Sequence, residues 1–185
     1  MKKVLIVVDY QVDFVNGSLG FEDGKSIEKF IVSKLEEYIE NKDSIIFTFD
    51  THDEKTYFDS VEGSFIPIKH CIENTPGWQL YGDVRKYEKY GIKFLKNTFG
   101  SLDLGNYLKK EKFDYIELVG LISNICLFSN AVIAKMACPN SKIIVLKDGT
   151  STLVNGKDYD IKIIHILVIR IVKIISDIWN VKIER

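Results

Sequence analysis

Apolar strands separated by helix-patterned segments are the feature that most constrains the fold of this chain. Val4–Val8 is an unbroken run of aliphatic residues, mostly β-branched. Three further runs are mainly apolar: Ser44–Phe49, Tyr115–Leu121 and Lys142–Leu146. A strand with apolar residues on both sides is buried on both faces, as in a parallel sheet covered by helices. We therefore expect an α/β fold whose strands pair in parallel.

Helical patterns fill the intervals between these runs. Ser26 is typical of an N-cap, and one apolar face follows it at helical spacing: Ile27, Phe30, Ile31, Leu35 and Tyr38. Leu102–Lys110 is predicted as another helix, and a third carries Cys126 in its first turn. Ile92–Lys96 and Val181–Ile183 complete the prediction as short strands, with a long loop over residues 51–78.

The segment from Asp158 to Asp177 is predicted to be the last helix. Residues 161–178 are very apolar, but a narrow stripe of polar side chains interrupts them: Lys162, His165, Arg170, Lys173 and Asp177. This pattern indicates a largely buried amphipathic helix rather than a membrane span. Its apolar face is wider than one sheet face covers, so we expect a homo-oligomer.

Length and composition limit the remaining possibilities. A chain of 185 residues is expected to form one domain over residues 1–185. The net charge is −1 and no basic run occurs, which argues against nucleic acid as a partner. Met1 is followed almost at once by a strand too short for a signal sequence. The expected lack of a signal sequence, together with three irregularly spaced cysteines, favours a cytoplasmic protein with reduced thiols.

Four reactive side chains lie at or just after the carboxyl ends of predicted strands: Asp9, Asp50, Lys96 and Cys126. In a parallel α/β sheet these ends lie along the edge where ligands bind. Taken singly, Cys126 would more often be a buried structural thiol and Lys96 a solvated lysine. Together with Asp9 they suggest a nucleophile, a cation and a base. A helix N-terminus at Cys126 would also lower the thiol pKa.

A second group of side chains follows the second strand. Asp50, His52, Glu62 and His70 lie within residues 50–70, which hold two of the three histidines in the chain. Two imidazoles with two carboxylates form a ligand set suited to zinc, manganese or iron. The alternative is that they are ordinary polar residues of a loop.

These motifs together resemble the isochorismatase-like cysteine hydrolases, and among them most closely the nicotinamidases. The resemblance rests on Asp9-Tyr-Gln-Val-Asp-Phe14, Asp50-Thr-His52, Lys96 and the segment Gly120–Cys126. It extends, in order and spacing, over about residues 3–150. The family resemblance implies a three-layer α/β/α fold with a six-stranded parallel sheet in the order 3-2-1-4-5-6.

The resemblance also implies roles for residues. Asp9, Lys96 and Cys126 match the catalytic triad. A cis peptide bond would join Leu121 to Ile122, and the N–H groups of Ile122 and Cys126 would form an oxyanion hole.

Asp50, His52 and His70 match the ligands of one divalent metal ion in this family, and Glu62 lies at a ligand position that some members fill with Glu and others with His. Phe14 would form a wall of the substrate site. The implied reaction is hydrolysis of a small amide through a thioester. The leading case is the hydrolysis of nicotinamide by water to nicotinate and ammonia, which is a step of NAD salvage.

The chain also departs from the family pattern. Asn124 occupies a position that is commonly Asp, Ile122 replaces a small residue, and the pattern diverges from about residue 154. Two alternatives therefore stay open. One is another small-amide or ureide hydrolase of this superfamily, and the other is a catalytically weakened binding protein.

Overall fold

A six-stranded parallel sheet forms the centre of the computed structural model, which describes residues 1–152 and 181–184. The strands are β1 (Lys3–Val8), β2 (Ser44–Asp50), β3 (Ile92–Lys96), β4 (Tyr115–Gly120), β5 (Lys142–Thr150) and β6 (Val181–Glu184). Their order across the sheet is β3-β2-β1-β4-β5-β6, and each neighbouring pair is parallel. The predicted fold class and strand order are therefore confirmed.

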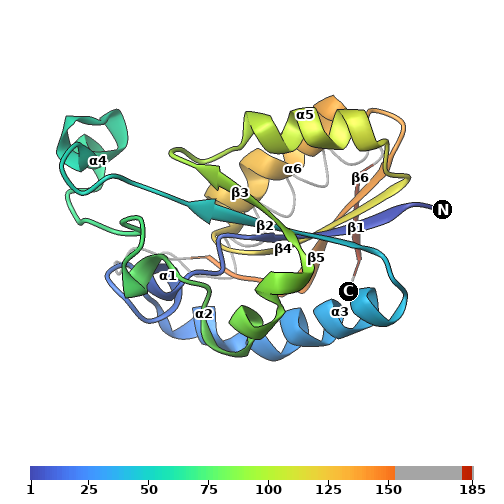
Figure 1. Ribbon diagram of the computed structural model, residues 1–185, viewed down its shortest axis with the longest axis horizontal. Coiled ribbons are helices and arrows are strands. Elements are labelled where there is room, and N and C mark those ends of the chain that lie inside the picture. Colours follow the sequence, from blue (N-terminus) through green and yellow to red (C-terminus); the bar gives the residue numbers. More distant parts are fainter. Residues whose placement is uncertain (153–180, 185) are drawn as a thin grey trace.

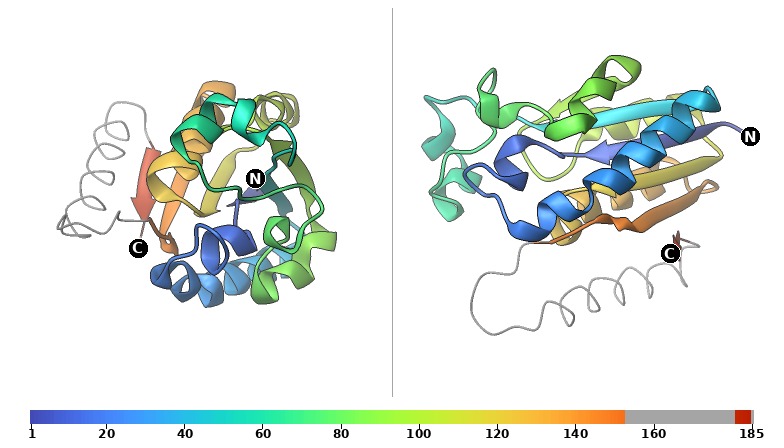
Figure 2. Two further views of the ribbon diagram at one scale, coloured as in Figure 1. Left: turned by 90° about the vertical axis from the view of Figure 1, so that its left-hand side faces the viewer. Right: turned by 90° about the horizontal axis from the view of Figure 1, so that it is seen from below.

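Helices cover both faces of the sheet (Figure 1). The α-helices are α1 (Val12–Val15), α2 (Glu22–Ser26), α3 (Glu28–Glu40), α4 (Val61–Phe65), α5 (Leu102–Glu111) and α6 (Phe128–Ala137). Single-turn and longer 3-10 helices are η1 (Tyr57–Asp59), η2 (Pro76–Trp78) and η3 (Gly82–Tyr90). Helices α5 and α6 lie on one face and α3 on the other, which gives the predicted three layers (Figure 2).

The two faces of the sheet have separate apolar cores. On β1, Leu5 and Val7 belong to the core beneath α3, whereas Val4, Ile6 and Val8 belong to the core beneath α5 and α6. All five side chains are completely buried. Each contributes about 1.5–3 kcal/mol of burial free energy. This two-sided burial explains why residues 4–8 of β1 are all apolar.

Three local predictions are corrected by the structure. Ser26 is the last residue of α2 and not the N-cap of α3, because its hydroxyl donates to the Asp23 carbonyl at 2.6 Å. The predicted loop 51–78 contains α4 and two 3-10 turns. Cys126 lies in a π-helical turn, η4 (Ser123–Leu127), and α6 begins only at Phe128.

The end of the chain is described only in part. The predicted strand Val181–Ile183 is found as β6, whereas the predicted helix Asp158–Asp177 lies outside the described residues. The homo-oligomer inferred from that helix stays a prediction. Within residues 1–152 and 181–184, no helix is long and apolar enough to cross a membrane.

Candidate active site

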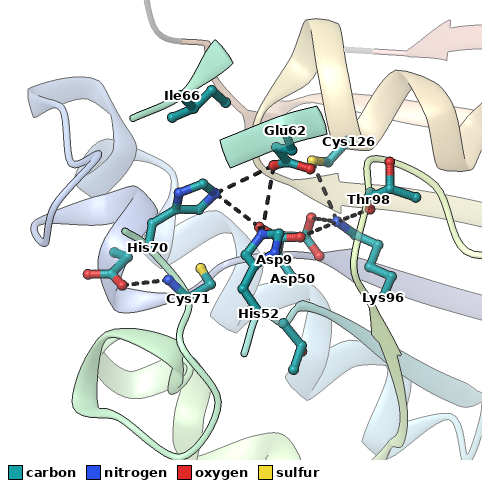
Figure 3. A network of polar contacts seen from close by, with 12 residues as sticks. Asp9, Asp50, His52, Glu62, Ile66, His70, Cys71, Lys96, Thr98 and Cys126 are labelled. Atoms are coloured by element: carbon teal, nitrogen blue, oxygen red, sulfur yellow. Dashed lines mark hydrogen bonds and ion pairs between the residues drawn. The ribbon is translucent and has the colours of Figure 1, made fainter. Parts of the chain in front are cut away.

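The carboxyl ends of β1, β2 and β3 bring three charged side chains together. Asp9 follows β1, and Asp50 and Lys96 are paired in register as the last residues of β2 and β3. The Lys96 Nζ lies 2.6 Å from Asp9 Oδ2 and 3.4 Å from Asp50 Oδ1. Its distance to Cys126 Sγ is 3.6 Å (Figure 3). The four strand-end residues predicted to converge do so.

Glycine at the end of β4 lets the chain turn toward this group. Gly120 has a φ of +112°, and a Cβ there would lie 2.0 Å from the Val8 carbonyl oxygen. Only glycine allows this close approach. One residue further along, the Leu121–Ile122 peptide bond is cis, as predicted. The π-helical turn η4 then carries Cys126, whose side chain is 6% exposed.

Burial controls the charges of the three residues. Burial and the Asp9 carboxylate raise the pKa of the Cys126 thiol well above its usual range, although Lys96 lowers it. Burial also raises the pKa of Asp9, against the opposing charge of Lys96. The expected lowering of the thiol pKa by a helix N-terminus is therefore not found. Burial and the Asp9 charge thus favour the protonated form of the Cys126 thiol, which lies beside Lys96.

The four predicted metal ligands also converge. One ligand atom from each of Asp50, His52, Glu62 and His70 lies within 4.8 Å of all the others. The two imidazole Nε2 atoms, of His52 and His70, are 3.0 and 3.3 Å from Asp50 Oδ2. They are 3.8 and 3.6 Å from Glu62 Oε1 (Figure 3).

The chemistry of this cluster fits a divalent cation. Glu62 Oε2 is buried and has no hydrogen-bond partner among the described residues. His70 Nδ1 is 2.9 Å from the Ile68 carbonyl and 3.0 Å from the Tyr57 hydroxyl, which leaves Nε2 facing the two carboxylates. Ligand histidines are commonly oriented by such contacts.

The charges support the same interpretation. Burial alone would lower the pKa of His70, but its hydrogen bonds with Asp50 and Glu62 raise the pKa to about 10. Burial would raise the pKa of Asp50, yet Lys96 and the imidazoles hold it below its usual range. The carboxylates therefore favour positive charge at the point where the four residues meet, which a metal ion would supply.

Several positioning residues were not recognised from the sequence as having a role. The Gln11 amide accepts from the Asp50 N–H at 2.8 Å and donates to the Asp50 carbonyl at 2.9 Å. Asp13 Oδ2 accepts from the Cys71 N–H at 2.7 Å, directly beside His70. Thr48 donates to Asp9 Oδ1 at 2.7 Å. Both Gln11 and Asp13 lie in the quoted N-terminal motif, but their partners are distant in sequence.

The remaining predicted residues line the surroundings of the site. The Phe14 ring is 5.5 Å from the His70 ring, centre to centre, and is buried. Ile122 is buried next to η4. Asn124, the departure from Asp, accepts a hydrogen bond from the Thr152 hydroxyl at 2.6 Å. The neutral amide at this position thus has a defined partner.

Comparisons with known proteins agree with this geometry. The family model described as the isochorismatase domain matches residues 3–166. A Bacillus subtilis protein described as an uncharacterized isochorismatase family protein, PncA, is 34% identical over 144 residues, covering 71% of this chain and 78% of its own.

Two solved structures illustrate the similarity of the fold. The crystal structure of nicotinamidase PncA from Bacillus subtilis has a TM-score of 0.80 at 25% identity, with all of both chains covered. A Pyrococcus horikoshii pyrazinamidase in complex with zinc has a TM-score of 0.81 at 20% identity, covering 100% of this chain and 99% of its own.

Proposed function

Because the chain belongs to the isochorismatase family of hydrolases, we propose that it hydrolyses a small amide, with nicotinamide as the first candidate substrate. The observation that carries the proposal is the contact of a buried thiol, an ammonium and a carboxylate beside a four-residue ligand set. Nicotinamidases and pyrazinamidases are among the proteins of similar fold.

In the proposed reaction Cys126 is the nucleophile and Asp9 the general base. The raised thiol pKa means that the proton must leave as the thiol attacks, and Asp9 is the carboxylate beside it. The carboxamide carbon bonds to Sγ and forms a tetrahedral intermediate. Protonated Asp9 then gives its proton to the departing ammonia. Water, deprotonated by Asp9, finally cleaves the thioester and releases the acid.

Lys96 is proposed to hold the other two groups in place. Its ammonium contacts both Asp9 and Cys126 and donates to the Thr98 carbonyl at 3.0 Å. A fixed cation here stabilises the sulfur as negative charge develops on it.

The N–H groups of Ile122 and Cys126 are the proposed oxyanion hole. Among the described residues, no main-chain hydrogen bond uses the Ile122 N–H, whereas the neighbouring Ser123 N–H donates to the Ser151 carbonyl at 2.9 Å. A free N–H beside the nucleophile is what a developing oxyanion needs.

Asp50, His52, Glu62 and His70 would hold one divalent ion, zinc, manganese or iron. When bound, such an ion would act as a Lewis acid that orients the substrate ring through its nitrogen. Phe14, which lies against His70, would then contact that ring.

An ammonia-release assay on a panel of small amides tests this proposal. The panel contains nicotinamide, pyrazinamide, a ureide and an aliphatic amide, and the metal content of the same preparation is measured. We expect release from the aromatic amides by the metal-loaded protein. A preference for the ureide would make ureides, rather than aromatic amides, the substrate class. If the metal-loaded protein releases ammonia from none of the compounds, a binding protein is favoured.

A further inference from the structure

A buried asparagine lies one helical turn beyond the nucleophile. Asn130 is on α6 and is 0% exposed, among apolar neighbours that include Ala131 and Ala134. A buried amide is costly unless its polar atoms are paired. Such a residue in the middle of an apolar helix face therefore needs a specific reason.

All polar atoms of this side chain contact main-chain groups of two segments. The Nδ2 group donates to the Cys126 carbonyl at 2.8 Å and to the Phe99 carbonyl at 3.1 Å. The Oδ1 atom accepts from the Ser101 N–H at 3.1 Å. The opposite amide orientation would place Oδ1 against two carbonyls, so the partners fix the orientation.

The second of these segments belongs to the loop that follows Lys96. The Lys96 ammonium donates to the Thr98 carbonyl, one residue before Phe99. Gly100 lies so close to α6 that a Cβ there would be 2.5 Å from Ile133 Cδ1. The loop is therefore held against α6, and Asn130 provides hydrogen bonds across that contact.

We propose that Asn130 is a positioning residue, which sets the Cys126 thiol against the Lys96 ammonium by joining the main chains of both segments. The inference rests on the proposed function, because it assigns Asn130 to the same thiol chemistry. No other side chain among the described residues is hydrogen-bonded to both the Cys126 main chain and the 99–101 loop.

The test measures how fast iodoacetamide alkylates Cys126 at neutral pH, with the modified peptide identified by mass spectrometry. In Asn130→Ala, we expect the rate to fall about tenfold or more, because Lys96 no longer stabilises the attacking sulfur. Asn130→Thr should be intermediate, since a threonine hydroxyl can bond the Cys126 carbonyl one turn back but cannot reach the loop. The amide assay should show kcat reduced by a similar factor and KM within about twofold.

Leu108→Ala is the matched control for destabilisation. Leu108 is completely buried in α5 and contacts neither Cys126 nor the loop through hydrogen bonds. It should lower the melting temperature without changing the alkylation rate. Alkylation that is unchanged or faster in both folded Asn130 variants would overturn the proposal. If Asn130→Ala fails to fold, Asn130→Thr alone decides.

The two arms separate this inference from the proposed function. Slower alkylation together with no hydrolysis of any amide by the unmodified protein would leave the positioning role standing and remove the amidase proposal. If the Asn130 variants hydrolyse amides normally and their alkylation rate is unchanged, the amidase proposal stands and the positioning role is removed.

Discussion

The proposed catalytic trio (Asp9, Lys96 and Cys126) and the proposed metal-ligand cluster share one edge of the sheet but are built differently. Asp9 follows β1 and Lys96 ends β3, on either side of β2, and Cys126 is held by the turn that leaves β4. Strand register therefore places Asp9 and Lys96, and the turn after β4 places Cys126. The cluster takes only Asp50 from a strand.

The other three ligands of the cluster depend on the chain between β2 and η2. His52 pairs with the segment of His70, because its N–H donates to the Cys71 carbonyl at 3.0 Å. Glu62 belongs to α4, which lies away from the sheet and packs mainly against η1 (Figure 1). The comparison suggests that the trio is preformed, whereas metal binding depends on how well loop residues are held.

Cys126→Ala should have the largest effect on turnover and almost none on the metal cluster. We expect kcat to fall by at least about a thousandfold, since no other thiol contacts Lys96 among the described residues. Metal content, measured by plasma mass spectrometry, should stay the same. Cys138→Ala is the control, and an equal loss in that variant would remove Cys126 as the nucleophile.

Asp9→Asn should change two properties of the thiol in opposite directions. Hydrolysis should fall by about 10²–10⁴-fold because the general base is lost. The pKa of Cys126 should fall, because Asp9 raises it and its neutralisation leaves the lowering effect of Lys96 less opposed. The pH profile of Cys126 alkylation should therefore move to lower pH. A shift to higher pH would contradict the assigned electrostatics.

His70→Ala should have the converse effect of Cys126→Ala. Loss of a ligand should weaken metal binding by more than about a hundredfold while Cys126 alkylation is retained. Glu62→Gln should weaken binding only about tenfold, because α4 has few contacts to hold that ligand in place. Equal effects of the two substitutions would show that Glu62 is held as firmly as the histidine.

Asp13→Asn should have the smallest effect on metal binding, and it should act only through the loop that carries His70. Asp13 is not a proposed ligand, but its carboxylate holds the Cys71 N–H beside His70. We expect metal affinity to fall about tenfold with the alkylation of Cys126 unchanged. Asp23→Asn, in the exposed part of α2, is the control, and a comparable loss there would show that the effect is nonspecific.

The same contrast explains what could be predicted from the sequence. The unbroken apolar run before Asp9 predicted a buried parallel strand, so the meeting of Asp9, Lys96 and Cys126 followed from topology. Glu62 was predicted as a metal ligand from its residue type and from the family resemblance. No strand or helix periodicity in the sequence indicated where its side chain would lie.

Other features could not be predicted because they depend on contacts distant in sequence. Nothing local to Asn130 reveals that the 99–101 loop lies against it. The raised thiol pKa also depends on burial and on Asp9, which outweigh the expected effect of a helix N-terminus. Ser26 failed as a predicted N-cap because its hydroxyl instead bonds the preceding turn.

The central claim is that an amide is cleaved through a thioester on Cys126, and trapping that intermediate tests it most directly. Metal-loaded protein is mixed with nicotinamide, quenched in acid during turnover, digested and analysed by mass spectrometry. We predict a nicotinoyl group on the Cys126 peptide, removed by hydroxylamine and absent from Cys126→Ala. Ammonia release by Cys126→Ala at the unmodified rate, or acylation at another residue, would contradict the mechanism.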